Sequence, residues 1–185
     1  ETRTLTIVED VATGRSEIGI LYLSDFNRKA MVKLFNNNDL DFTKLITCDA
    51  YVYLWKKHPL AKEKSISFEQ LKDYPCLSFD QNAKSVFYYA EEILTENEYP
   101  KMIKTTDRAT NLNLMVGLNA YTLCSGIICE ELNGGDFVAV PFEADKENPN
   151  SKMEIGYITK KNIVLSDTGE DYLKELKAYL SKCNK

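Results

Sequence analysis

Short apolar runs alternate with longer amphipathic segments along almost the whole chain, and this alternation is the strongest constraint on its fold. The mostly apolar run 17–23, bounded by turn-forming residues, is typical of a strand buried on both faces of a parallel sheet. Further runs that predict strands are 42–47, 51–55, 76–79, 102–104, 121–124, 137–140 and 153–159. Strands that alternate with helices predict an α/β fold with mixed, mostly parallel sheets flanked by helices.

Apolar residues at helical spacing supply the helices of this pattern. They predict helices over 5–12, 26–35, 83–96 and 127–132. Two more helices are expected to start after Asp107 and at Ser166, both of which are residues that cap helices well. A capping box formed by Ser67 and Gln70 predicts a short additional helix before the strand at 76–79.

The charge and cysteine content exclude several classes of protein. With 23 basic and 28 acidic residues, the 185-residue chain has a formal net charge of -5, which argues against direct binding of nucleic acid. No apolar run approaches the ~20 residues that span a membrane. The five cysteines are odd in number and include no C-x-x-C pair. We therefore expect free thiols in a reducing cytosol, without disulfides or a zinc site.

The sequence offers little to support catalysis. His58 is the only histidine, and its position before Pro59 predicts a solvated turn residue. A single imidazole is a poor basis for general-base chemistry or a zinc cluster. There is no G-x-S-x-G, Walker or H-E-x-x-H motif, and no pair of acidic residues is singled out by its spacing. We expect a protein that is not an enzyme and that uses no metal or cofactor.

Four phrases of the sequence, in order and at similar spacing, resemble the effector-binding domain of LysR-type bacterial transcription regulators. Residues 11–21 (VATGRSEIGIL) resemble the family's helix, Gly-Arg turn and D-I-G-I strand, with Glu17 where aspartate is usual. Residues 58–61 (HPLA) resemble a turn of the family, and residues 65–75 (SISFEQLKDYP) resemble the helix that follows it. Residues 165–169 (LSDTG) fit the opening of the closing helix.

The resemblance implies the two-lobed fold of type 2 periplasmic binding proteins, with two crossing strands between the lobes and the effector in the cleft. Residues 1–54 and 153–185 would form lobe I, and residues 55–152 would form lobe II. The family's first strand, helix and strand are not found, so lobe I is expected to be incomplete. The run 17–23 is then expected at an open sheet edge, covered by a partner chain or a displaced helix. The family's helix-turn-helix is also absent from this chain.

Polar residues follow several predicted strands or precede predicted helices, where ligands of open α/β sheets bind. Helix N-termini favour carboxylates and other small anions, because their N–H groups are free and partially positive. By resemblance, the hydroxyl side chains of Ser24, Ser78, Thr106 and Thr122 would bind the effector. Their neighbours suggest further contacts, with Arg108 as a clamp for a carboxylate and Phe79 and Tyr121 as walls of the cleft. The alternative roles are helix caps for the hydroxyl side chains, a surface salt bridge for the arginine and core packing for the aromatic rings.

These observations lead to one main hypothesis and two alternatives. The chain is expected to be the effector-sensing domain of such a regulator, binding a small anionic metabolite between the lobes and passing a conformational change to a DNA-bound oligomer. Its expected partners are the effector, copies of the same chain in a dimer or tetramer, and DNA only through the absent domain. We expect it in the cytoplasm, without membrane contact. The alternatives are a free-standing solute-binding protein of a transporter and an α/β enzyme of unknown type.

Overall fold

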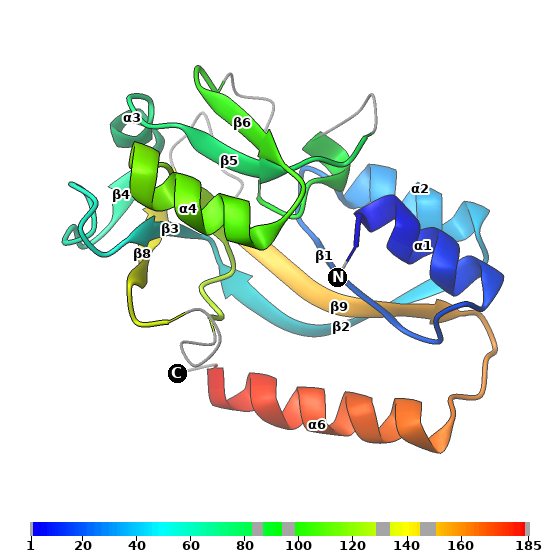
Figure 1. Cartoon of the computed structure of the whole chain (residues 1–185). Coiled ribbons are helices and arrows are strands. Elements are labelled where there is room, and N and C mark those ends of the chain that lie inside the picture. Colours follow the sequence, from blue (N-terminus) through cyan, green and yellow to red (C-terminus); the bar gives the residue numbers. More distant parts are fainter. Residues whose placement is uncertain (1, 83–86, 94–98, 129–133, 145–150, 184–185) are drawn as a thin grey trace.

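The strands of the chain divide into two main sheets (Figure 1). The first sheet has the order β1 (Gly19–Leu23), β9 (Lys152–Lys160) and β2 (Leu40–Asp49), and both of its pairings are antiparallel. The structure is a computed structural model, which describes residues 2–82, 87–93, 99–128, 134–144 and 151–183.

The second sheet has four strands, in the order β4 (Ile66–Ser67), β8 (Phe137–Glu143), β3 (Tyr51–Trp55) and β7 (Thr122–Cys124). A separate parallel pair, β5 (Cys76–Phe79) and β6 (Met102–Thr105), lies next to it. A parallel bridge from Cys76 to Tyr121, the residue before β7, connects this pair to the second sheet.

Helices cover both faces of the first sheet. α1 (Thr4–Thr13) and α2 (Arg28–Asn37) lie on one side of it, and α6 (Asp167–Cys183) runs along the other side (Figure 1). The apolar face predicted for α1 is confirmed, because it packs with α2 and the strands in one buried cluster: Val8, Val11, Leu23, Met31, Phe35, Leu40 and Ile158.

Three short helical elements accompany the second sheet and the β5–β6 pair: α3 (Phe68–Leu71), the 3-10 turn η1 (Phe87–Tyr89) and α4 (Arg108–Leu118). The capping box predicted before α3 is confirmed, since the amide of Ser67 donates to Oε1 of Gln70 over 2.9 Å. The expected cap of α4 is also present, because Oδ1 of Asp107 accepts from the amide of Thr110 over 2.8 Å.

The chain passes between the two sheets twice, and the two passages are hydrogen-bonded to each other. β2 leads into β3 at Ala50, and β8 returns to β9 through residues 144–151. The amide of Ala50 donates to the carbonyl of Ser151 over 2.6 Å, and the carbonyl of Ala50 accepts from the amide of Phe142 over 3.0 Å. β3 therefore pairs within the second sheet, and the change of sheet falls at Ala50, before the predicted boundary at residue 54.

The direction of the strands differs from the prediction. The sheets are mixed, as expected, but the prediction that they are mostly parallel is wrong for the described strands. Only the β4–β8 and β5–β6 pairs are parallel, while the four other strand pairs are antiparallel. The reason is the return of β9 from the second sheet, which places it between β1 and β2 and opposite to both. An apolar run indicates burial, but it does not indicate the direction of its neighbours.

Two predicted helices also differ from the structure. Of the segment 83–96, only residues 87–93 are described, and they contain the 3-10 turn η1 followed by non-helical residues. Ala90 and Ile93 are nevertheless buried in the core under the second sheet, so burial without helix accounts for their spacing. Most of the helix predicted at 127–132 lies outside the described residues, and 127 and 128 are not helical.

β1 lies at the edge of the first sheet among the described strands, as predicted for the run 17–23. α1 packs directly on its face. A Cβ atom at Gly19 would lie 2.5 Å from Cγ2 of Ile7 and 3.1 Å from Cγ2 of Val11, so the close approach of helix and strand requires glycine. α1 covers the face of β1, and the cover expected for its edge stays a prediction.

Glu17 attaches the start of α6 to the segment that leads into β1. Its Oε2 accepts from the hydroxyl of Ser166 over 2.7 Å, and its Oε1 accepts from the amide of the same serine. The Ser166 hydroxyl in turn accepts from the amide of Gly169 over 3.1 Å, in the first turn of the helix. A carboxylate at this position also interacts favourably with the positive end of the helix dipole.

Replacing Glu17 should therefore destabilise the domain. We expect Glu17→Ala to lower the free energy of unfolding by about 1–2 kcal/mol, the usual effect of losing a charged cap. Urea denaturation followed by circular dichroism measures the change. Glu9→Ala, which removes an exposed acidic side chain from α1, is the matched control. Equal losses in the two variants would show that Glu17 does not anchor α6.

Candidate functional site

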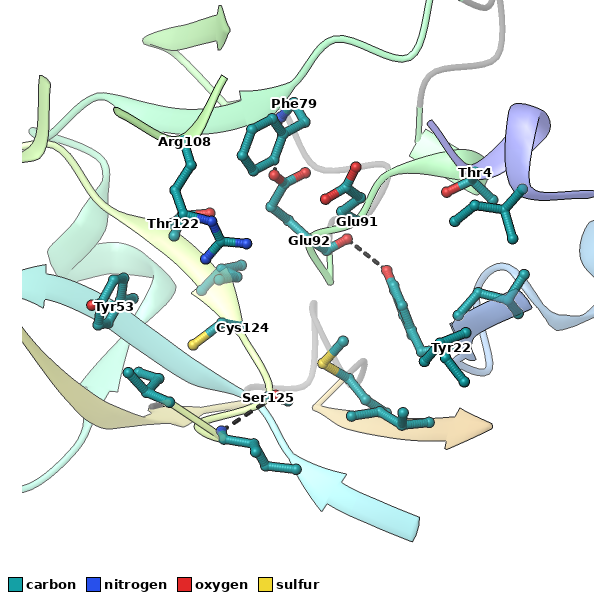
Figure 2. Close-up of a pocket in the computed structure, with 18 of the residues that line it drawn as sticks. Thr4, Tyr22, Tyr53, Phe79, Glu91, Glu92, Arg108, Thr122, Cys124 and Ser125 are labelled. Carbon is teal, nitrogen blue, oxygen red and sulfur yellow. Dashed lines mark hydrogen bonds between the residues drawn. The ribbon is translucent and has the colours of Figure 1, made fainter. Parts of the chain in front are cut away.

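A cavity of about 440 Å³ is lined by residues of both sheets (Figure 2). Its volume lies in the ~300–1,000 Å³ range of small-molecule pockets. One wall comes from α1, β1 and β9 and is largely apolar. The other comes from β3, β7 and the residues after β7. Phe79 at the end of β5, Glu91, Glu92 and Arg108 at the start of α4 complete it.

A second, more polar cavity of about 360 Å³ adjoins the first and shares four residues with it, Thr2, Phe79, Glu91 and Arg108. It adds Arg3, Asp80, Thr106 and Asp107. The larger cavity thus supplies the apolar volume, and the smaller one extends it toward a charged rim.

Two hydrogen bonds connect α1 and β1 to Gln81 and Glu92 at the edge of these cavities. The amide of Thr4 donates to Oε1 of Gln81 over 3.0 Å. The hydroxyl of Tyr22 donates to the main-chain carbonyl of Glu92 over 2.6 Å. A change in the angle between the sheets would have to break or rearrange these contacts.

Glu92 is the most unusual side chain of the cavity wall. Its side chain is only 3% exposed, and two protein groups donate hydrogen bonds to its carboxylate. Oε2 accepts from the hydroxyl of Ser78 over 2.9 Å, and Oε1 accepts from the amide of Phe79 over 3.0 Å. Burial raises the pKa of Glu92 to about 7, although both donors favour the ionised form. The carboxyl group is therefore near its titration midpoint at neutral pH.

Four of the seven predicted effector-binding residues lie at these cavities. Phe79, Arg108 and Thr122 line the larger one, and Thr106 lines the smaller one together with Phe79 and Arg108. Figure 2 shows Arg108 on the opposite side of the cavity from Tyr22, with Glu91 and Glu92 between them.

The other three predicted residues are buried and line neither cavity. Ser24 turns toward Asn27, whose Oδ1 accepts from the Ser24 amide over 2.7 Å. Tyr121 packs in the core, and Ser78 reaches the site only through Glu92. The cause is the alternation of side chains along a strand. Because Phe79 and Thr122 face the cavity, their neighbours Ser78 and Tyr121 point the other way.

His58 is buried, contrary to the solvated position predicted for it. It is 3% exposed, and its ring packs against Tyr74 with 4.4 Å between the ring centres. Nδ1 accepts from the amide of Leu60 over 3.0 Å, so Nε2 carries the proton and donates to the carbonyl of Asn119 over 3.0 Å. Burial lowers the pKa of His58, which keeps the ring neutral. The histidine holds the end of α4 against the turn after β3.

The described residues also bear on metal binding, disulfide formation and membrane spanning. Within the described ranges, no three acidic, cysteine or histidine side chains gather as metal ligands would. Cys48, Cys76 and Cys124 are free thiols, while Cys183 and Cys129 lie outside the part whose side chains are described. None of the described helices has both the length and the apolar character needed to cross a bilayer.

An α/β scaffold with a cavity of this size, lined by residues of both sheets, is typical of small-molecule-binding domains. The model of the LysR substrate binding domain family matches residues 1–181. The chain therefore belongs to this family, and it is the effector-binding domain of a LysR-type transcription regulator. A comparison with curated protein sequences finds no match.

Solved structures of LysR-type proteins share the fold. The oxidised form of OxyR has a TM-score of 0.64 at 14% identity, covering 100% of this chain and 82% of that one. The effector-binding domain of QuiR in complex with shikimate has a TM-score of 0.60 at 17% identity, covering 99% and 80%. Full-length CbnR with its target DNA has a TM-score of 0.56 at 12% identity, covering 88% and 53%. The expected type 2 periplasmic-binding-protein-like fold is confirmed.

The raised pKa of Glu92 predicts a specific dependence of stability on pH. A carboxyl group with an ordinary pKa of 4.5 in the unfolded chain and about 7 in the folded chain contributes stability that is lost as the pH rises between these values. Glutamine at this position cannot titrate. The stability of the natural chain relative to Glu92→Gln should therefore fall by about 3 kcal/mol from pH 4.5 to pH 8.

Urea denaturation at four pH values across this range measures the difference. Glu63→Gln changes an exposed glutamate outside both cavities and serves as the control, for which the difference should stay constant. Parallel pH profiles for the natural chain and Glu92→Gln would contradict the assignment of a titrating Glu92.

Proposed function

We propose that this effector-binding domain senses a small metabolite with an anionic group, bound in the cavity between the two sheets. The observation that carries the proposal is the lining of this cavity, to which both sheets contribute and in which Arg108 supplies a guanidinium group. A ligand held by both sheets can favour one relative arrangement of them, which is the physical requirement for a sensor.

The anionic group is proposed to lie against Arg108, with Thr122 and Thr106 as neighbouring hydroxyl donors. A guanidinium group binds a carboxylate through two parallel hydrogen bonds. Arg108 is also the first residue of α4, so the positive end of the helix dipole lies nearby. The effector-binding domain of QuiR was solved with shikimate, a carboxylic acid, which supports a ligand of this chemistry.

The response is proposed to pass from the cavity to DNA through the rest of the regulator. The two lobes would be close to the predicted residues 1–54 with 153–185 and residues 55–152, each centred on one sheet, with β3 belonging to the second lobe. The whole protein would act in the cytoplasm as a dimer or tetramer, through a separate DNA-binding domain. The solved complex of full-length CbnR with its target DNA supports this arrangement. The cavity would bind its ligand without catalysis, and the family match favours a regulator over the transporter alternative.

A thermal-shift screen against small carboxylate metabolites tests the proposal. A true ligand should raise the melting temperature saturably, with ~2.7 kcal/mol of added stability at a hundredfold excess over its dissociation constant. Arg108→Gln should lower the affinity for the same ligand at least about tenfold, because the variant loses the charge-assisted hydrogen bonds to the carboxylate.

Arg15→Gln is the matched control, because Arg15 is an exposed arginine paired with Asp10 and does not line either cavity. Equal affinity in the Arg108→Gln and Arg15→Gln variants would place the ligand elsewhere. A screen in which no metabolite binds the domain would contradict the sensor function.

A further inference from the structure

The charges around the larger cavity do not match a purely anionic ligand. Its lining contains two carboxyl groups, Glu91 and Glu92, and one guanidinium group, Arg108. The adjoining cavity adds Asp80, Asp107 and Arg3. Nε of Arg3 already donates to the carbonyl of Asp80 over 3.0 Å. Among the described lining residues, a ligand that carries only negative charge would meet more acidic than basic groups, and like charges repel strongly in an apolar cavity.

Glu92 is held so that it can still accept a further hydrogen bond. A carboxylate offers about four acceptor sites, and the hydrogen bonds from Ser78 and Phe79 use one site on each oxygen. The side chain is almost completely buried and still lines the cavity. Burying a carboxyl group without a cation beside it is unfavourable, and a positively charged ligand group would compensate for that.

Among the described residues, the other titratable groups that act on Glu92 are neutral or of the same charge. Tyr22 on β1 and Cys76 on β5 interact with it electrostatically, and burial raises the pKa of both above the usual range, which keeps them uncharged. Glu91 lies beside it, and Tyr99 lies near Tyr22. The negative charge at this end of the cavity therefore comes from the two adjacent glutamates.

Independently of Glu92, Tyr53 gives the cavity wall a polar group that can still form a hydrogen bond with a ligand. Its side chain lines the cavity, it is only 8% exposed, and its hydroxyl has no hydrogen-bond partner in the described part of the structure. The positive charge of Arg108 acts on this hydroxyl, although burial has the larger effect and raises the pKa of Tyr53. Buried hydroxyl groups without partners are rare, and they mark places where a bound group completes the network.

The remaining wall of the cavity is apolar and comes from both sheets. Aliphatic and thioether side chains form it: Ile7, Ile20, Leu21, Leu123, Met153 and Ile155. A ligand that fills the cavity must therefore carry an apolar part in addition to its charged groups.

Building on the proposed function, we infer that the effector is a zwitterion with an apolar body, such as an apolar amino acid, whose ammonium group binds Glu92 and Glu91 while its carboxylate binds Arg108. Each charged group of such a ligand meets the opposite charge, and the apolar body lies against the aliphatic wall. The two carboxyl groups of the protein thus select against ligands that have a carboxylate alone.

Matched probes test this inference. Leucine, methionine and phenylalanine are compared by thermal shift and calorimetry with the carboxylic acids that lack the amino group, 4-methylpentanoate, 4-(methylthio)butanoate and 3-phenylpropionate. The corresponding amines without a carboxylate form the third set. At least one amino acid should bind at least about tenfold more tightly than both of its analogues.

Carboxylates that bind as tightly as their amino-acid partners, or that bind when no amino acid does, would overturn the inference and leave the sensor function intact. A domain that binds none of the probes, but that does bind another metabolite without an amino group, would overturn it in the same way. Failure of every metabolite would remove the sensor function itself.

Proton release gives a second readout that a purely structural role of Glu92 would not produce. An ammonium group beside Glu92 favours its ionised form, so binding of the amino acid at pH 7 should release protons. Calorimetry in phosphate and in Tris detects this release as a difference in apparent enthalpy. Glu92→Gln should abolish the release and weaken binding at least about tenfold, while Glu63→Gln should change neither.

Circular dichroism establishes that each variant is folded, and Glu91→Gln replaces Glu92→Gln if the latter does not fold. Glu91→Gln should likewise lower the affinity for the amino acid at least about tenfold relative to the affinity for its deaminated analogue. Unchanged affinity and unchanged proton release in the folded variant would overturn the inference.

Discussion

The paired passage of the chain between the two sheets is the constraint on which the rest of the structure depends. Ala50 is the meeting point, where its amide bonds to Ser151, just before β9, and its carbonyl bonds to Phe142 of β8. These bonds use only main-chain atoms, and the small side chain of Ala50 leaves room for the core around it. The two sheets are therefore held to each other by main-chain bonds at Ala50, and residues of both sheets line the cavity.

The chemistry of the cavity depends on its low polarity. Its largely aliphatic wall lowers the local polarity, so the few charged groups at its end interact more strongly than they would at the surface. Burial likewise keeps Tyr22 and the core residue Cys76 protonated and raises the pKa of Glu92 to about 7. Recognition of a ligand here is consequently a matter of matching charge as well as filling volume.

The sequence predicts the helices and strands of this fold better than it predicts how they pair and pack. The strands 51–55 and 76–79 and the caps at Ser67 and Asp107 are local features, and local patterns find them. The direction of β9 depends on a long-range return of the chain, which no local pattern contains. Residues 87–93 have helical spacing but are buried by contacts with the second sheet, so tertiary packing overrides the propensity.

The same distinction applies to the site. Strand ends bring Phe79 and Thr122 to the cavity lining, whereas Ser78 and Tyr121 are buried away from it, a distinction that no local sequence pattern contains. Glu92 lies in no recognisable motif, and only the fold brings it against Ser78. Two adjacent glutamates, Glu91 and Glu92, between the apolar residues Ala90 and Ile93 are the one signal that could have drawn attention to it.

The bond between Tyr22 and Glu92 has a consequence for how such a domain can evolve. The tyrosine hydroxyl bonds to the carbonyl of Glu92, which every amino acid at that position would also present. The side chain of the same residue faces the cavity. Selection can therefore replace this side chain, and with it the preferred molecule, without losing the contact that ties the two halves together. Related regulators could therefore come to bind a different effector through a few substitutions while they keep the hydrogen bond between Tyr22 and the carbonyl of residue 92.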